Sequence, residues 1–273
     1  SDLANIIGGC CGTTPEHIMA IKHASKNEKP LQRRSIKSFS LASRTKSFVY
    51  EEEKRPFVIG ERINPTGKKA LSAELVEGKA TLIRKYALEQ TRKGAALLDI
   101  NVGTSGCDEV TMMKKAVRAV QAVSQLPLVI DTGDPTVLEV GLREAVGKVL
   151  INSVNGEVKN INSVCALAKK YGAAILGLTT DEQGIPQNKE KRMDIIRRIA
   201  DAAQNQFHIP QRDMVIDPLT LTLASEAQQA KETLLTLKMT KASYGVLTSL
   251  GISNISFGLP NRSRTNAQFL SLA

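Results

Sequence analysis

Short apolar runs recur along the chain from residue 57 onward, and each ends in small or polar residues before a stretch with helical periodicity. The runs are FVIGERIN (57–64), ALLDINVG (96–103), PLVIDTGD (127–134), KVLINSVNG (148–156), AAILGLTT (173–180), DMVIDPLT (213–220) and NISFGLPN (254–261). Runs that are apolar on both faces are typical of buried parallel strands. The pattern therefore predicts seven such strands.

The stretches between these runs predict amphipathic helices. Segments 82–94 and 110–124 carry apolar residues at positions i, i+3, i+4 and i+7, and Gly94 and Gly172 stand where helices would end. Strand–helix alternation predicts an α/β fold, a (β/α)8 TIM-type barrel, with a doubly wound sheet as the alternative. The missing G-x-G-x-x-G after the first run disfavours that alternative. No eighth run follows residue 261, so we expect an incomplete barrel.

The first 53 residues predict two further segments ahead of the barrel. Residues 1–25 predict a short strand at 3–7, a glycine-rich turn, and a helix that begins at Pro15 and is capped by Thr14. Residues 26–53 are polar and basic without a sustained period, so we expect a linker with a short strand near 48–50. The barrel is then expected over residues 54–273.

Charge and composition narrow the classes of function. The chain has a net charge of +10, and residues 26–55 hold nine Lys/Arg against four Glu. This basic stretch raises nucleic-acid binding as an alternative, but no aromatic residues are interleaved and no known motif appears, which favours a solvated linker. No apolar run is long enough for a membrane span and no signal segment is present. Four cysteines without paired spacing lead us to expect a reducing cytoplasm.

Polar residues gather where the predicted strands end. They are Glu61, Asn64, Asp99, Asn101, Asp131, Asn152, Asp217, Asn254 and, just beyond, Arg262. Taken singly, Asp and Asn at such positions can be turn formers and helix caps, as we expect for Asp134 before Pro135. Taken together they would converge on one mouth of a parallel barrel, and they suit a neutral, polar, planar heterocycle. A Ser-His nucleophilic triad is excluded, because these ends carry no histidine.

The order of these residues resembles a known family. Asp131 in the third run, Asn152 in the fourth and Asp217 in the sixth match the pattern of pterin-binding barrels, which include dihydropteroate synthase and methyltetrahydrofolate:corrinoid methyltransferases. IGERINPTG (59–67) and SNISFGLPNR (253–262) are similar to the folate domain of cobalamin-dependent methionine synthases. Dihydropteroate synthases would offer a lysine where this chain has Asn254. The resemblance covers residues 54–273.

This resemblance implies transfer of the methyl group of 5-methyltetrahydrofolate to cob(I)alamin carried on another domain. Asp131, Asn152 and Asp217 would hold the pyrimidine edge of the pterin. Asn254 would accept a hydrogen bond from protonated N5, so Asn254 and Asp217 are the implied catalytic residues. Glu61, Asn64 and Arg262 would make additional folate contacts, and Asp99 would support the others.

The stretch GGCCGTTPEHI (8–18) is similar to the end of a homocysteine-binding barrel. From the residues alone, Cys10 and Cys11 could be two buried or free thiols. The resemblance implies that they are two of three thiolates that bind zinc, the third lying upstream. We therefore expect the chain to be a piece of a longer protein, with homocysteine and cobalamin bound by other parts. The alternatives are a dihydropteroate synthase-like enzyme and a non-catalytic fragment.

Overall fold

The computed structural model describes residues 6–28, 38–50 and 56–273, and the chain divides into two units, Ser1–Lys37 and Ser38–Ala273. The first unit contains α1 (Pro15–Ser25), none of whose residues is buried. The backbone N–H of Thr14 donates to Nδ1 of His17 at 3.1 Å, which fixes the start of α1. The predicted helix is confirmed, whereas most of the strand predicted at 3–7 lies outside the described residues.

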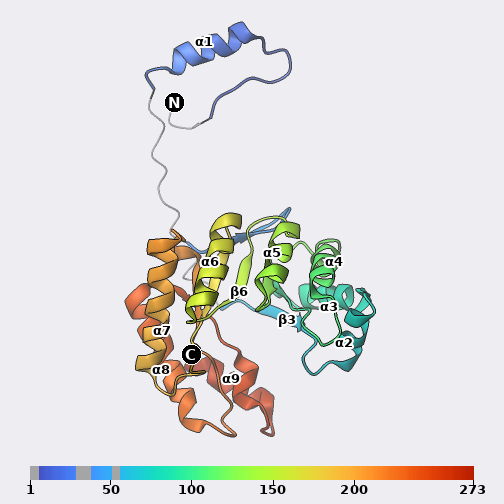
Figure 1. Cartoon of the computed structure of the whole chain (residues 1–273), viewed down its shortest axis with the longest axis vertical. Coiled ribbons are helices and arrows are strands. Elements are labelled where there is room, and N and C mark those ends of the chain that lie inside the picture. The colour runs from blue at the N-terminus through green and yellow to red at the C-terminus, as the bar shows by residue number, and fades with distance from the viewer. Residues whose placement is uncertain (1–5, 29–37, 51–55) are drawn as a thin grey trace. The chain divides into compact units, whose positions relative to one another are not determined.

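The second unit is built on a parallel sheet whose seven strands follow one another in chain order, and Figure 1 labels two of them, β3 and β6. The strands are β3 (Ile59–Ile63), β4 (Leu97–Ile100), β5 (Leu128–Asp131), β6 (Leu150–Val154), β7 (Ala174–Leu178), β8 (Met214–Asp217) and β9 (Leu247–Thr248). Each of the first six corresponds to a run predicted from the sequence. The sheet curls, and its strand order is that of a TIM-type barrel with β3 and β9 as its edge strands.

Helices connect the strands and cover the outer face of the curled sheet, and the last helix follows the seventh strand and packs against the segment just before it (Figure 1). They are α2 (Lys69–Val76), α3 (Thr81–Arg92), α4 (Glu109–Gln121), α5 (Pro135–Glu144), α6 (Val158–Tyr171), α7 (Lys189–Asp201), α8 (Ala227–Tyr244) and α9 (Arg262–Leu272). Short π- and 3₁₀-helical segments lie at η1 (Ala202–Gln206), η2 (Gln211–Asp213) and η3 (Ile252–Ser256). Gly172, in the left-handed conformation, ends α6 as predicted.

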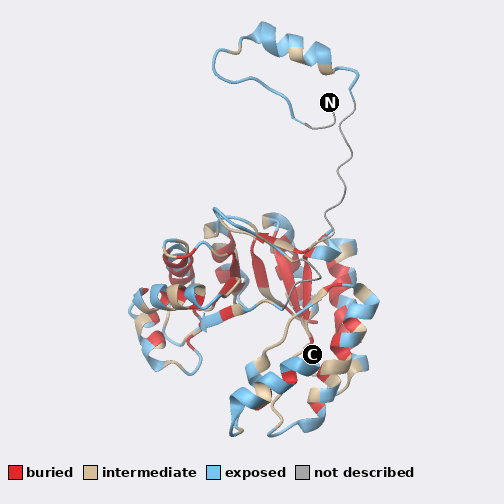
Figure 2. Cartoon of the chain, turned by 180° about the vertical axis from the view of Figure 1, so that it is seen from behind, coloured by how far each residue is buried: buried red, intermediate tan, exposed pale blue. Residues whose placement is uncertain are grey.

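Two apolar layers line the two faces of the sheet, and Figure 2 shows the strands as its most continuously buried part. Alternate residues face opposite sides of a strand. Leu98, Ile130 and Ile151 face the helices. Their neighbours on the inner face form a second apolar cluster, the inner cluster, which comprises Phe39, Leu41, Leu97, Val129, Leu150, Ala174, Leu176 and Val215.

Residues 38–50 form a hairpin of β1 (Ser40–Ala42) and β2 (Ser47–Val49) that belongs to the barrel unit. The backbone N–H of Ala42 donates to the carbonyl of Lys148, and the Ser43 hydroxyl donates to the carbonyl of Gln125. These contacts lie just before β5 and β6, and the hairpin adds Phe39 and Leu41 to the inner cluster. The hairpin thus closes the amino-terminal end of the barrel. The sequence pattern predicted only the strand near 48–50 and assigned the rest to a linker.

The seventh predicted strand is misplaced. Residues 254–261 form the end of η3 and a loop, whereas the seventh strand is β9, at Leu247–Thr248. The apolar residues Ile252 and Ile255 are three apart, which matches the three-residue turn of a 3₁₀-helix, and Ile255 is fully buried. Because only two residues of β9 pair with β8, its period of two cannot be recognised in the sequence.

Within the described residues, no helix combines the length and the apolar character that crossing a membrane requires.

Candidate functional site

The inner face of the sheet changes from apolar to polar toward the carboxyl ends of the strands. Two residues beyond Leu97, Val129, Leu150 and Val215 of the inner cluster stand Asp99, Asp131, Asn152 and Asp217, which the two-residue period places on the same face. Glu61 is likewise two residues beyond Ile59, which packs against that cluster. We call these five side chains the polar layer. The change of residue type along the strands therefore places a polar site at the carboxyl-terminal mouth of the barrel.

Hydrogen bonds join side chains at the ends of β4, β5 and β6. Nδ2 of Asn152 donates to Oδ1 of Asp99 at 3.2 Å, and Nδ2 of Asn101 donates to Oδ2 of Asp131 at 2.9 Å. Asp131 and Asn152 are also direct neighbours in the register of β5 and β6. Asp99, Asn101, Asp131 and Asn152 are thus one connected group on three adjacent strands.

Burial changes the acidity of the two carboxyl groups in this group. Desolvation, with the nearby charges of Asp131 and Glu61, raises the pKa of Asp99 well above its usual range, although the bond from Asn152 opposes the change. Desolvation also raises the pKa of Asp131, against the bond from Asn101. Asp99 is only 3% exposed, and its interaction with Asp131 contributes to the rise of its pKa. Because burial and nearby negative charge disfavour ionisation, both carboxyl groups hold a proton more tightly than an ordinary aspartic acid does.

Asp217 ends β8 beside the end of β9. Its Oδ1 accepts the backbone N–H of Leu219 at 2.8 Å, and Ser249, whose own N–H bonds to the carbonyl of Ile216, donates to its carboxyl group. Desolvation raises the pKa of Asp217 to about 6, while these bonds and the charge of Arg192 act in the opposite direction. The carboxylate is therefore ionised at neutral pH but poorly solvated, which favours its pairing with N–H donors of a ligand.

A fully buried arginine holds the segment that follows Asp217. Arg192 of α7 is 0% exposed and makes five hydrogen bonds, all to uncharged oxygens. Its Nη1 donates to the carbonyls of Pro218 and Leu219 at 2.9 and 3.3 Å. Leu219 has a φ of 63°, a conformation that a bulky residue rarely adopts. Arg192 therefore stabilises a strained loop from which the N–H that bonds Asp217 projects.

Glu61 on β3 and Asn64 directly after it differ in their contacts. Glu61 is exposed, and its charge acts on the pKa values of both Asp99 and Asp131, so it lies near them. Oδ1 of Asn64 accepts the N–H of Thr66 at 2.9 Å, and the carbonyl of Asn64 accepts from Nζ of Lys68. Asn64 is thus engaged in shaping the turn after β3.

Asn254 and Arg262 lie in the segment after β9. Asn254 is on η3 and exposed, and its amide folds back over Gly251, where an added Cβ would meet Nδ2 at 3.0 Å. Arg262 donates to the hydroxyl of Ser256 and the carbonyl of Ser253, and its guanidinium lies 5.9 Å from the centre of the Phe257 ring. Asn254 is therefore on a loop rather than at a strand end, and Arg262 braces that loop.

Cys10 and Cys11 are both exposed, and their sulfur atoms lie 3.8 Å apart. Hydrogen bonds from Cys11 lower the pKa of Cys10. Two thiolates on one tetrahedral zinc ion would be about 3.8 Å apart at the usual Zn–S length, so the pair fits one edge of such a site. Residues 6–28, 38–50 and 56–273 contain no group of three or more His, Cys, Asp or Glu side chains arranged to hold a metal ion.

Three residues that contact the site were not assigned a role from the sequence. Asn101 was signalled by its place two residues after Asp99, on the same side of the chain. Ser249 follows a strand too short to be recognised. Arg192 had no signal, because it stands in a helix with eight charged residues among thirteen, where burial of one arginine cannot be told from exposure.

Comparison with known proteins agrees with this geometry. The model of the pterin-binding enzyme family matches residues 60–273, and the homocysteine S-methyltransferase model matches residues 1–25. The chain is 33% identical over 97% of its length to a methionine synthase of Mycobacterium tuberculosis, and 31% identical to one of Mycobacterium leprae. It spans 23% and 24%, about a quarter, of those proteins.

Solved structures of dihydropteroate synthases share the fold. One from Xanthomonas albilineans matches with a TM-score of 0.60 and 20% identity, covering 86% of this chain and 88% of the other. Another, from Vibrio fischeri, matches with a TM-score of 0.57 and 18% identity, covering 86% and 87%. Taken with the family match over residues 60–273, the seven-stranded sheet and its polar layer show that the chain belongs to the pterin-binding enzyme family.

Proposed function

We propose that this chain binds 5-methyltetrahydrofolate in the mouth of its barrel and takes part in transferring the N5-methyl group to cob(I)alamin, as one section of a methionine synthase. The observation that carries the proposal is the polar layer on the inner face. In that layer, Asp131 and Asn152 are register neighbours and Asp217 lies across the mouth on β8. The similarity to methionine synthases over 97% of the chain supports this choice among pterin enzymes.

The polar layer suits the pyrimidine edge of a pterin. That edge presents N–H donors beside a carbonyl and ring nitrogens, so it needs carboxylates as acceptors and an amide that can both donate and accept. Asp131 and Asp217 are the acceptors, and Asn152 is the amide. Because Asn152 donates to Asp99 and Asn101 donates to Asp131, two members are held in place before a ligand arrives.

Methyl transfer leaves negative charge on N5, so N5 must be protonated as the methyl group departs. An amide cannot supply a net proton. Solvent supplies the proton to N5, and Asn254 acts by accepting a hydrogen bond from the protonated N5 and stabilising its positive charge. Asn254 lies on η3 and is exposed. Glu61, Asn64 and Arg262 are proposed as further folate contacts.

Reduced cobalamin supplies the nucleophile that accepts the methyl group, and we assign none of its contacts to this chain. Cys10 and Cys11 fit one edge of a tetrahedral zinc site and would be two of its ligands in the whole protein, where zinc would activate the homocysteine thiol. No step of the folate reaction is routed through them. The cytoplasm is the proposed compartment.

The test is the affinity of the chain for 5-methyltetrahydrofolate, measured by calorimetric titration. Replacing a carboxylate that accepts charged or polarised N–H groups removes about 1.5–3 kcal/mol, so Asp217→Ala should weaken binding about 10- to 100-fold. Asp194→Ala is the matched control, since Asp194 is a 60% exposed carboxylate on α7 that pairs with Arg197. Near-normal affinity of Asp217→Ala would contradict the proposal.

Dihydropteroate synthesis is the second candidate, because the solved structures with the shared fold are dihydropteroate synthases. The candidates separate in an assay of condensation between a pterin pyrophosphate and aminobenzoate. We expect no product, because Asn254 stands where a lysine would be expected in that enzyme. Product formation at a rate that Asp217→Ala abolishes would replace our assignment.

A further inference from the structure

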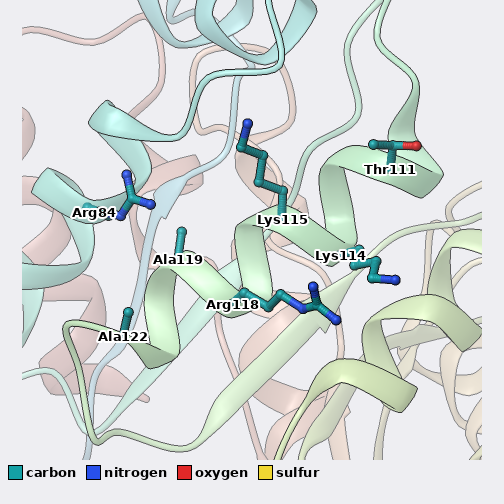
Figure 3. A pocket seen from close by; sticks show the side chains of 7 residues that line it. All are labelled: Arg84, Thr111, Lys114, Lys115, Arg118, Ala119 and Ala122. Atoms are coloured by element: carbon teal, nitrogen blue, oxygen red, sulfur yellow. The ribbon is translucent and has the colours of Figure 1, made fainter.

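A basic hollow lies between α3 and α4, on the side of the helices that faces away from the sheet. Its volume is about 350 Å³. Figure 3 shows Arg84 on the α3 side and Lys115 and Arg118 on the α4 side, with the small side chains of Ala119 and Ala122 between them. Because the alanine side chains are short, Ala119 and Ala122 form the apolar bottom of the hollow, and the longer cationic side chains stand around it.

The cations of this hollow are only partly neutralised. Lys115 donates to the carbonyl of Gly78, and among the described residues no carboxylate lies within 4 Å of its ammonium group. Within the described parts of the chain, Arg84 has no carboxylate within 4 Å. Arg118 and Lys114 both pair with Glu144 of α5, at 2.6 and 3.7 Å. One carboxylate thus faces four positive charges.

The contact with Glu144 shows that Arg118 can pair with a carboxylate at this hollow. Nε and Nη2 of Arg118 donate to the two oxygens of Glu144 at 2.6 and 3.1 Å, the two-pronged geometry that suits a planar carboxylate. A second hollow of about 400 Å³ adjoins the first at Thr111 and Lys114, between α4 and α5, and adds Arg143. The two hollows make one basic furrow across α4.

We propose that this basic furrow docks an acidic segment of a partner polypeptide, whose carboxylates pair with Arg84 and Lys115 while its backbone passes over Ala119 and Ala122. A second copy of this chain is a poor occupant because its net charge is +10. A nucleic acid held by base stacking is also a poor occupant, because none of the residues lining either hollow is aromatic. The furrow lies on the outer helices, whereas the folate site lies on the inner face of the sheet, so the proposal does not depend on the folate chemistry.

Fluorescence anisotropy with the full chain and a labelled poly-glutamate peptide of about twelve residues tests the proposal, since such a peptide exceeds the ~20 Å length of α4. We expect Arg84→Glu to weaken binding about tenfold, because it removes one attraction and adds one repulsion. Lys85→Glu is the control: it makes the same charge change on the next residue of α3, which is exposed and does not line the hollow. We expect it to change affinity less than twofold.

A second variant tests whether the shape of the hollow contributes to binding independently of its charge. Ala122→Leu fills the floor without changing charge, and we expect it to weaken binding about fivefold. Equal losses for Arg84→Glu and Lys85→Glu would mean that only the net charge attracts the peptide, and would overturn the proposal. So would unchanged affinity of Ala122→Leu, or equally tight binding of a polyphosphate of the same charge. Circular dichroism of each variant confirms that it is folded.

Discussion

At the scale of single residues, the proposed folate site is made of carboxyl groups that the fold removes from water. Asp99, Asp131 and Asp217 all have raised pKa values, and desolvation is the main cause in each. Desolvation of a charged group opposes folding unless partners replace the lost water. The bonds that Asn152, Asn101 and Leu219 make replace only part of it. The remaining capacity to accept hydrogen bonds is what a ligand with N–H donors would satisfy.

Asp217 makes a definite contribution to how stability depends on pH. Its folded-state pKa of about 6 is above the ordinary 3.8, so the folded protein binds this proton more tightly than the unfolded chain. Its effect on stability therefore becomes less favourable as the pH rises from about 4 to about 6, by up to about 3 kcal/mol. Asp217→Asn removes this titration. The unfolding free energy of the variant minus that of the parent should rise across this window and then stay level.

Urea unfolding at several pH values between 4 and 8 measures this difference. Taking the difference cancels the titration of Asp99 and Asp131, which is common to both proteins. The control is Asp194→Asn on α7, where the carboxylate is 60% exposed and we expect an almost flat difference. A flat difference for Asp217→Asn as well would show that its carboxyl group is not desolvated in the folded protein.

At the scale of elements, the contact between α7 and the segment that joins β8 to α8 holds the carboxyl end of β8 in place. Arg192 spans from the carbonyl of Pro186 to those of Pro218 and Leu219, and to Thr233 and Gln229 of α8. It therefore ties together the strand that carries Asp217 and the two helices beside it. Among the residues that the structure describes, no carboxylate bonds to it, and oriented dipoles and the more distant Glu232 and Asp217 balance its charge.

Arg192→Met should destabilise the protein by about 3 kcal/mol or more, because it leaves several buried oxygens without donors. Arg197→Met is the control on the same helix, since Arg197 is 63% exposed and its ion pair with Asp194 is worth about 0.5 kcal/mol at most. Arg192→Lys keeps the charge but loses the two-pronged geometry, and we expect an intermediate loss. Urea unfolding ranks the three, and a loss for Arg192→Met no larger than that of Arg197→Met would refute the role.

The sequence pattern predicted the strands that are both long enough and buried enough to form a continuous apolar run. The strands from β3 to β8 have buried apolar stretches, and the pattern therefore also predicted which polar residues lie at their carboxyl ends. The pattern did not predict secondary structure correctly where tertiary contacts determine it. The 254–261 run lies in a 3₁₀-helix and a loop because Ile255 is buried from a turn rather than from a strand. The β1–β2 hairpin was missed because Phe39 and Leu41 gain their burial from strands more than fifty residues away.

At the scale of the whole molecule, the two ends of the barrel have opposite character. The hairpin packs Phe39 and Leu41, 4% and 1% exposed, against the amino-terminal half of the inner face. The carboxyl-terminal half of the same face carries the polar layer. Because the hairpin covers the amino-terminal end with apolar side chains, a polar ring would approach the inner face from the end that carries the polar layer. The range that looked like a linker thus helps to define which end of the barrel is the mouth.

Truncation separates the contribution of this hairpin from that of the first unit. None of the residues of α1 is buried, so a chain that starts at Ser38 should keep its free energy of unfolding within about 0.5 kcal/mol. A chain that starts at Glu51 loses both buried side chains and should be destabilised by about 4 kcal/mol or more. In the full chain, Leu41→Ala should cost about 2–5 kcal/mol, and Val49→Ala, where Val49 is 44% exposed, much less. If Leu41→Ala unfolds at the same urea concentration as Val49→Ala, the inner cluster does not depend on the hairpin, and another segment must close that end of the barrel.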